Sequence, residues 1–472
     1  MRLLVVGGGP AGVTAALHAR ELGAEATLVE ARRVGGTSVN EGPAPVRTLA
    51  RAARLMRDAR SWERFGLHGE VPQVDIAAVL ANASRVAGYA HEEKRLVDRL
   101  RGSGVEVVEQ AGPAAFVDPR TVRTPDGRTF GGDAVVVAVG GHAGTLPVPG
   151  ADLALTYEDV PGLTALPASV AVVGGADTGC QLASILADFG ARVTLVEAAA
   201  ALVSRADADV SAGLAESFGH RGIRVLTGTF VERLEPTPTG TAVHYRSGTE
   251  SGRLDVERVF LAVGWPGNAG TLGAEAVGIA TERGYVRVDY CLRSSLAHVF
   301  AAGDVNGLSM LVPSARHEGR IAAQNAVLGT RRRFDHTVVP TGSFTDPEYG
   351  SVGLTEAEAR ERHDCAVGVA RYEDLLRPVA DGRPEGFCKL IVESHRRYVL
   401  GAHVLGEYSA EVIQMAAACM AANLRVEQIA ELQPAFPTFT EGVGVAAQKV
   451  VRDLGVTAWA PPWSDLPPAD GE

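Results

Sequence analysis

Short apolar runs that end in glycines dominate the hydrophobic pattern of the chain. The run RLLVVGGG lies at the start, and SVAVVGG, DAVVVAVGG, ERVFLAVGW and VFAAGDV follow the same pattern. Short runs bounded by turn residues predict buried strands, and the stretches between them with helical spacing predict helices. The pattern therefore predicts an α/β protein.

Two segments repeat one pattern. One begins at Arg2 and the other at Ser169, and each continues as an apolar strand, a glycine turn, a helix and a second strand ending in TLVE. Strand–helix–strand units of this kind build nucleotide-binding folds. The repeat predicts two Rossmann-like nucleotide-binding domains in one chain.

The rest of the pattern predicts the other elements and the domain boundaries. Residues 48–100 have helical spacing, and a further helix is predicted from about Ser314 to Leu328. After Pro340 the pattern predicts a mixed antiparallel sheet with flanking helices. The predicted segments are 1–148, 149–265, 266–336 (which returns to the first domain), 337–455 and a polar, proline-rich tail over 456–472.

Composition narrows the class of protein. A chain of 472 residues with 46% hydrophobic and 21% charged residues has an ordinary globular composition. Its net charge of −11 argues against nucleic acid or an anionic membrane as the main partner. No window holds about 18 uninterrupted apolar residues, so we expect no membrane span. The N-terminal apolar run is too short for a signal peptide and predicts a strand.

The five cysteines predict neither a disulfide framework nor a metal site. They are scattered, and no pair has the CxxC spacing. An odd, scattered set fits a reducing compartment, so we expect a cytoplasmic protein. We expect each of them to be a small buried apolar residue. The set is Cys180, Cys291, Cys365, Cys388 and Cys419.

The first glycine turn, GGGPAG at residues 7–12, matches the dinucleotide pattern G-x-G-x-x-G directly after a strand. Gly7 allows the tight turn, Gly9 lets the backbone approach a pyrophosphate, and Gly12 lets the helix pack against its strand. Glu30 ends the second strand, where a carboxylate can hold a ribose diol. Together these features predict a bound dinucleotide.

The second glycine turn, GGADTG at residues 174–179, has Ala176 in place of the middle glycine. The extra methyl group narrows the path of a pyrophosphate, which predicts weaker or shifted binding. Glu197 ends the next strand, and residues 198–201 are all alanine, so NAD is favoured over NADP. A turn that no longer binds a nucleotide is the alternative interpretation.

Several motifs occur in one order along the chain, namely VVGGGPAG, GGTSVNEGPAPVR, VVGGADTG, AVGWPGN, VFAAGDV, FTDPEYGSVGLTEAEA and PTFTEG. With them the chain resembles the pyridine nucleotide–disulfide oxidoreductase family of dihydrolipoamide dehydrogenase, glutathione reductase and mercuric reductase. The resemblance runs from Arg2 to about Leu454. It implies FAD in the first nucleotide domain, a nicotinamide nucleotide in the second, and a C-terminal domain that forms a homodimer.

The resemblance also implies which residues bind the cofactors. Asp304, at the end of VFAAGD, is implied to bind the FAD ribityl chain, although by residue type alone it could equally cap its loop. The helix near residues 316–319 is implied to direct its N-terminus at the flavin pyrimidine. The full predicted set is Gly7, Gly9, Pro10, Ala11, Gly12, Glu30, Gly36, Thr37, Gly140, Asp304, Gly174, Gly179, Glu197 and Gly264.

The chain departs from this family where the thiol chemistry would lie. In GGTSVNEGPAPVR, Ser38 and Pro43 replace the two redox cysteines, and Arg47 replaces a lysine. Near the C-terminus Phe436 replaces the catalytic histidine, whereas the glutamate that orients it remains as Glu441. Neither a serine hydroxyl nor a proline ring can form a disulfide. These departures predict an enzyme that does not reduce disulfides.

Without the disulfide, a pocket is expected beside the flavin. Its predicted lining is Ser38, Pro43 and Arg47 of one subunit with Phe436 and Glu441 of the other. A cation, an apolar ring and a carboxylate suit a small, flat, partly anionic organic substrate. Glu441 either moves protons or braces the interface. Ser38 is interpreted as a filler rather than a nucleophile, since no histidine lies close in sequence to activate it, and Phe436 is interpreted as shaping the pocket.

Three other side chains have open interpretations. Arg47 either binds a substrate anion or pairs with a nearby acid such as Glu41. Asp177 and Gln181 stand where relatives often carry an aromatic residue and a glutamate. Because a carboxylate at Asp177 would repel nucleotide phosphates, we expect it to point to solvent.

Three functions remain open from the sequence. The first is an FAD enzyme that moves a hydride between NAD(P)H and a small organic substrate, such as a quinone or a biosynthetic intermediate. The second is a dehydrogenase or oxidase of an organic substrate with O2 or NAD as acceptor. The third is a catalytically silent, flavin-bound dimer with a binding or regulatory role.

Overall fold

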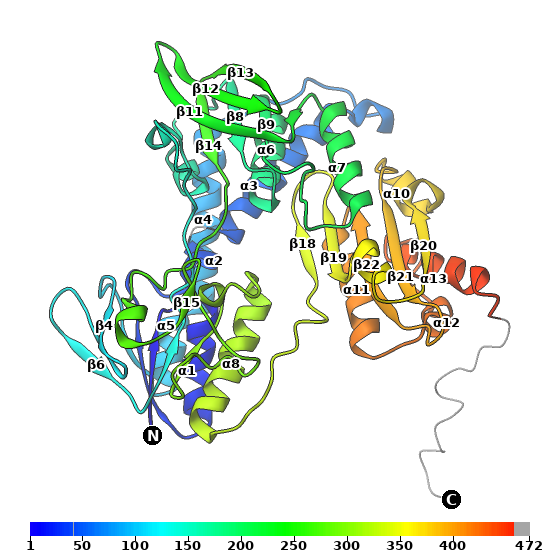
Figure 1. Cartoon of the computed structure of the whole chain (residues 1–472). Helices are drawn as coiled ribbons and strands as arrows, with labels where there is room; N and C mark the ends of the chain where they lie inside the picture. The colour runs from blue at the N-terminus through cyan, green and yellow to red at the C-terminus, as the bar shows by residue number, and fades with distance from the viewer. Residues whose placement is uncertain (41, 457–472) are drawn as a thin grey trace, which may run out of the picture.

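The structure is a computed structural model that describes residues 1–40 and 42–456 (Figure 1). All but the first residue of the predicted tail 456–472 lies outside this range. The chain forms two parallel sheets, an antiparallel sheet at its C-terminal end and smaller antiparallel sheets. This arrangement confirms the predicted α/β class, while the exact domain boundaries stay a prediction.

The first parallel sheet is built from both ends of the predicted first domain. Its strands, in spatial order, are β17 (Val299–Ala301), β7 (Ala134–Val137), β1 (Arg2–Val6), β2 (Glu25–Val29) and β3 (Glu106–Val108). Helices α1 (Pro10–Glu21) and α8 (Val312–Leu328) pack together over one face (Figure 1). The predicted helix from about Ser314 thus begins two residues earlier, because Pro313 fits a first helical turn.

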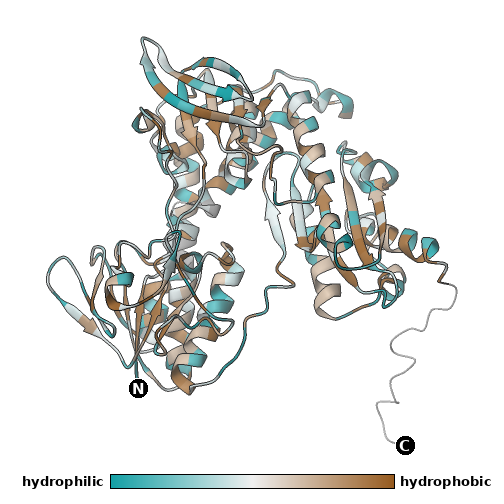
Figure 2. Cartoon of the chain, in the orientation of Figure 1, coloured by the Kyte–Doolittle hydropathy of each residue, from teal (hydrophilic) through white to brown (hydrophobic). Residues whose placement is uncertain are grey.

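The second parallel sheet repeats the first. Its strands, in spatial order, are β10 (Arg224–Leu226), β9 (Arg192–Val196), β8 (Ser169–Val173) and β14 (Arg258–Leu261). Helix α6 (Asp177–Phe189) connects β8 to β9 just as α1 connects β1 to β2, which confirms the duplicated strand–helix–strand unit. Figure 2 shows hydrophobic residues along the central strands of both sheets.

Smaller antiparallel sheets cover one face of each parallel sheet. On the first sheet these strands are β4 (Ala115–Asp118), β5 (Thr121–Arg123) and β6 (Thr129–Gly131). On the second sheet they are β11 (Thr229–Thr237), β12 (Gly240–Ser247) and β13 (Glu250–Val256).

The stretch with predicted helical spacing over 48–100 forms three helices. They are α3 (Pro43–Ala59), α4 (Ile76–Lys94) and α5 (Leu96–Gly102), preceded by the short helix α2 (Gly36–Asn40). A one-turn helix over Trp62–Phe65 ends at Gly66, whose φ of 75° lies in the left-handed region that stops a helix. Leu49 and Ala53 of α3 belong to the apolar core of the second sheet.

The C-terminal part is a five-stranded antiparallel sheet with helices on one face, as the pattern after Pro340 predicts. Its strands, in spatial order, are β18 (Thr341–Ser343), β19 (Tyr349–Gly353), β22 (Val399–Leu405), β21 (Phe387–Glu393) and β20 (Cys365–Arg371). The covering helices are α11 (Ser409–Ala421), α12 (Val426–Ala430) and α13 (Glu441–Asp453). Helix α7 (Ala208–His220) of the second sheet contacts β22.

Helix α3 is tied to the C-terminal sheet by buried charges. Arg54 donates to Glu407 at 2.7 Å and to Glu348 at 2.9 Å, and Arg57 pairs with Asp346. The three carboxylates are at most 10% exposed. We call these five residues the α3 charge cluster, and it joins parts of the chain that are nearly 300 residues apart in sequence.

Among the described residues, no helix is both long enough and apolar enough to cross a bilayer.

Candidate active site

One cavity of about 2190 Å³ contains both glycine turns. Its wall includes Gly9 of the first turn, Ala176 of the second, and Phe344 and Tyr349 of the C-terminal sheet. Ligands of open α/β sheets bind at the carboxyl ends of the strands, and both turns follow such ends. The cavity is therefore the candidate active site.

The first glycine turn has the geometry that its sequence predicts. Gly7 has a φ of 105°, and a side chain there would collide with the carbonyl oxygen of Ala138. A side chain at Gly12 would collide with the carbonyl oxygen of Gly7, so the helix lies directly on its strand. By contrast, a methyl group at Gly9 would meet only Gly36, at 3.9 Å, and Gly9 faces the cavity.

The two predicted ribose ligands, Glu30 and Glu197, have matching environments. Glu30 accepts hydrogen bonds from the backbone N–H groups of Gly8 at 2.6 Å and Arg32 at 2.7 Å. Glu197 accepts from Gly175 and Ala199 in the same way. Both carboxylates line the cavity. Since a carboxylate has about four acceptor positions, each keeps acceptor capacity for a ribose diol.

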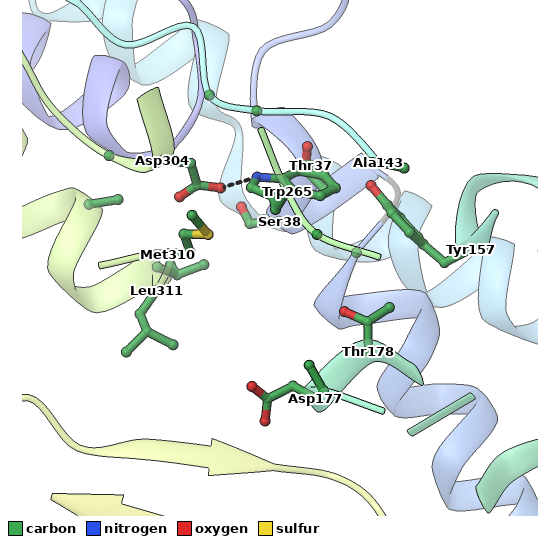
Figure 3. A pocket seen from close by; sticks show the side chains of 18 of the residues that line it. Thr37, Ser38, Ala143, Tyr157, Asp177, Thr178, Trp265, Asp304, Met310 and Leu311 are labelled. Atoms are coloured by element: carbon green, nitrogen blue, oxygen red, sulfur yellow. Dashed lines mark hydrogen bonds between the residues drawn. The ribbon is translucent and has the colours of Figure 1, made fainter. Parts of the chain in front are cut away.

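Asp304 follows β17 and lies on the cavity wall beside Trp265 (Figure 3). Its carboxylate accepts a hydrogen bond of 2.9 Å from the indole Nε1 of Trp265, and burial raises its pKa. The Trp265 ring also lies 5.8 Å, centroid to centroid, from that of Tyr157. Trp265 lies in the motif AVGWPGN, but nothing in the local pattern of residues assigns it a role.

A buried glutamate holds the loop that presents Asp304. Glu318 of α8 accepts hydrogen bonds of 2.7 Å from the backbone N–H of Gly303 and from the side-chain amide of Asn306. Its side chain is fully buried, and its other oxygen, Oε1, has no hydrogen-bond partner among the described residues. Burial raises the pKa of Glu318 to about 7.

The first half of the cavity fits FAD. The N-terminus of α1 has no side-chain cap, so its first backbone N–H groups are available to a pyrophosphate. Gly36 and Gly140 both have a positive φ and lie on the cavity wall. Because glycine has no side chain, a ligand can approach the backbone closely at these two positions. Of the predicted cofactor-binding residues, those on the wall are Gly7, Gly9, Pro10, Ala11, Glu30, Gly36, Thr37, Gly140, Asp304, Gly174, Glu197 and Gly264. Gly12 and Gly179 lie behind it and let their helices pack closely.

Two of the predicted catalytic residues, Ser38 and Arg47, lie on the cavity wall. The Ser38 hydroxyl donates to the carbonyl oxygen of Gly35 at 3.0 Å, so it is engaged within its own helix turn. The Arg47 guanidinium lies over the ring of Phe344, where desolvation lowers its pKa to about 10. Arg47 therefore keeps its positive charge at neutral pH. Glu41 and the Pro43 side chain lie outside the described residues.

The other two, Phe436 and Glu441, lie on the C-terminal part and not on this wall. Phe436 is 70% exposed and precedes α13. Glu441 is the first residue of α13, and its Oε2 atom is buried without a hydrogen-bond partner among the described residues. That these two meet Ser38 and Arg47 of another subunit stays a prediction.

At the second glycine turn the structure corrects one expectation. Ala176 is exposed, and its position puts the methyl group on the cavity wall. Asp177 was expected to point to solvent. It is exposed, but it lines the cavity, and its carboxylate accepts a hydrogen bond from the hydroxyl of Tyr349 in β19. Gln181 donates to the backbone carbonyl of Asp177 at 3.2 Å. The contact between Asp177 and Tyr349 forms because β19 packs against α6, which the local pattern does not reveal.

The five cysteines are not among the residues that line the cavity. Cys180, Cys365, Cys388 and Cys419 are buried as predicted, whereas Cys291 is partly exposed. Burial raises the pKa of Cys388 to about 12, which keeps that thiol protonated. None of the described wall residues is a cysteine, and no cluster of metal-ligating side chains occurs within 1–40 and 42–456.

Comparisons with known proteins agree with this geometry. The family model for pyridine nucleotide-disulphide oxidoreductases matches residues 1–319, and the model for their dimerisation domain matches residues 339–447. Dihydrolipoyl dehydrogenase of Zymomonas mobilis is 31% identical over 93% of this chain and 96% of its own. Mercuric reductase of Staphylococcus aureus is 28% identical over 96% of this chain and 83% of its own.

A solved structure extends the match to three dimensions. LpdA from Mycobacterium tuberculosis has a TM-score of 0.86 with this chain at 25% identity, and the match covers 95% of this chain and 99% of that one. The family binds FAD and NAD(P). With two nucleotide folds on one cavity, and both family models matched in order, the chain belongs to the pyridine nucleotide-disulphide oxidoreductase family.

Proposed function

We propose that the protein is an FAD-dependent oxidoreductase that works without a redox disulfide. It transfers a hydride, by way of the flavin, between NAD(P)H and a small organic substrate that is quinone-like or a biosynthetic intermediate. The observation that carries this proposal is the shared cavity. Both glycine turns open into it, and Ser38 occupies the wall where the resemblance places a redox cysteine.

In this reaction the role of the protein's own residues is to bind the substrate and to place charged and apolar groups around it. Bound FAD supplies reversible hydride transfer, which needs no sulfur. Arg47 contributes a cation to the wall, and Phe344 beside it contributes an apolar ring. A cation next to an aromatic face suits a flat organic molecule with partial negative charge.

The proposal includes a homodimer in which Glu441 and Phe436 of one subunit complete the pocket of the other. The buried, unpartnered Oε2 of Glu441 supports this arrangement, since a buried acceptor without a donor is costly in a finished structure. The match of residues 339–447 to the dimerisation domain supports it as well.

Anaerobic mixing with NADH or NADPH tests the function. We expect rapid loss of the flavin absorbance, its return when a quinone is added, and no reduction of a lipoamide or glutathione disulfide. Reduction by an organic substrate but by neither nucleotide would instead favour a dehydrogenase or oxidase. Retained FAD that no donor reduces would favour the catalytically silent dimer.

The variant Glu441→Gln tests the proton-transfer role of the carboxylate. We expect turnover to fall by about 100-fold, because a positioned acid or base contributes that much or more, while FAD content stays unchanged. Steady-state kinetics with a flavin absorbance check would measure both. Turnover equal to that of the parent would leave Glu441 with a structural role.

A further inference from the structure

A tyrosine from the C-terminal sheet reaches the second glycine turn. Tyr349 is the first residue of β19 and is 5% exposed, packed in the same apolar core as Cys180 and Leu182 of α6. Its hydroxyl donates to the Asp177 carboxylate. The two residues are 172 positions apart in sequence.

Asp177 carries a negative charge at an unfavourable place for a nucleotide. It is the first residue of α6, directly after Ala176, and both residues line the cavity. The N-terminus of a helix attracts anions, so a phosphate and the Asp177 carboxylate compete for the same backbone N–H groups. Within the described part of the chain, no ion pair that involves Asp177 occurs to neutralise it.

The hydrogen bond from Tyr349 offers the carboxylate another partner. Burial raises the pKa of Tyr349 well above 10, so its hydroxyl remains a donor at every physiological pH. A carboxylate engaged by this hydroxyl is directed at β19 and not at the start of its own helix. The Asp177 carboxylate is thereby held away from the position that a nucleotide phosphate would occupy at the start of α6.

We propose that Tyr349 is a positioning residue that sets the affinity of the second glycine turn for a dinucleotide by holding Asp177 off the pyrophosphate site. This deepens and rests on the proposed function, which places NAD(P)H at that turn. Under this proposal, the affinity for the nucleotide depends on the contact between the dimerisation domain and α6.

The test compares NADH and NADPH binding by the FAD-loaded protein and three variants. Tyr349→Phe should weaken binding about tenfold, because the released carboxylate repels a phosphate bound at the same turn. Raising the salt concentration should recover part of the loss. The double variant Tyr349→Phe/Asp177→Asn should regain at least the parent affinity, and Asp177→Asn alone should not weaken binding.

A matched control separates positioning from simple destabilisation. Tyr372 is fully buried in the same domain, and its hydroxyl donates to the backbone carbonyl of Glu407 at 3.2 Å. Tyr372→Phe should lower the melting temperature about as much as Tyr349→Phe, with nucleotide affinity unchanged.

Each outcome decides the inference. Unchanged affinity in Tyr349→Phe, or a loss that Asp177→Asn does not reverse, overturns it while leaving the proposed function in place. A parent protein that binds neither NADH nor NADPH overturns both. Weakened binding that the double variant restores supports both.

Discussion

Ala176 marks the chemical difference between the two nucleotide turns. It precedes α6 just as Gly9 precedes α1, and the two residues have nearly the same backbone angles, with φ of −85° and −71°. These angles are open to any residue, so glycine is not required by the backbone at either position. The difference that remains is one methyl group on the cavity wall, where a pyrophosphate would pass.

The variant Ala176→Gly should therefore bind NADH about three- to tenfold more tightly, since it removes a steric obstacle without adding a contact. Stability should change little, because glycine is acceptable at a helix N-cap. Equilibrium titration with NADH measures the affinity, and a thermal melt checks the fold. If affinity stays the same, the methyl group is not the obstacle.

Glu318 gives a residue-scale prediction about pH. Its pKa in the folded protein is about 7, above its usual value of 4.5. A carboxyl group with a raised pKa contributes stability that is complete below about pH 4.5 and is lost as the pH rises through about 7. The parent should thus lose up to about 3 kcal/mol of stability between pH 5 and pH 8 from this group.

The variant Glu318→Gln should remove that loss. Its amide oxygen can still accept from Gly303 and Asn306, so the Asp304 loop is retained. Denaturant unfolding of parent and variant at several pH values measures the difference. Parallel pH profiles would show that Glu318 does not titrate in this range.

At the scale of elements, α3 connects the three main parts of the molecule. Its first turns carry Arg47 to the cavity, its apolar face packs under the second sheet, and its arginines enter the α3 charge cluster. Buried charges are stable only when paired, so removal of one partner leaves the other uncompensated. The cluster should therefore matter more to stability than exposed ion pairs do.

The variant Arg54→Ala should lower the free energy of unfolding by about 3 kcal/mol, because Glu348 loses its ion-pair partner in a buried place. Adding Glu348→Gln should recover part of this loss. In Arg95→Ala, whose pair with Asp98 is more than 60% exposed on both sides, we expect a change within about 0.5 kcal/mol. Denaturant unfolding compares the three, and equal losses in Arg54→Ala and Arg95→Ala would contradict the argument.

At the scale of the whole molecule, one chain holds two nucleotide folds but only part of the proposed pocket. Ser38 and Arg47 lie on the cavity wall, whereas Phe436 and Glu441 lie on the dimerisation domain away from it. Phe436 is 70% exposed, so its ring is available to an interface. Under the proposed function, the active site is complete only in a homodimer.

In solution we expect a particle of twice the chain mass of 49.2 kDa. Phe436→Asp should shift it towards monomers and abolish turnover while FAD remains bound. Val117→Asp, on β4 of the first domain and 43% exposed in the parent, should leave the dimer intact. Sedimentation velocity distinguishes these outcomes, and an active monomer would contradict the shared pocket.

Several features of this protein follow from short stretches of sequence. The parallel strands, the paired glycine turns and the positions of Glu30 and Glu197 arise from steric limits and apolar runs within about 30 residues. The prediction of helical structure over 48–100 was less accurate. Gly66 ends a short helix, and a loop follows before α4. Burial was predicted for all five cysteines, and the structure confirms it for four of them but not for Cys291, which is partly exposed.

The remaining features depend on contacts between distant segments. Trp265 meets Asp304, Tyr349 meets Asp177, and Arg54 meets Glu348 only after the sheets have packed together. The hydropathy and the spacing of residues along the chain do not predict such pairs, because each residue alone is compatible with solvent or with several partners. From its residues the chain could be assigned two nucleotide folds and the absence of cysteine at positions 38 and 43. Which groups face the shared cavity, and where the charge of Asp177 points, came from the packing of α6, α3 and β19.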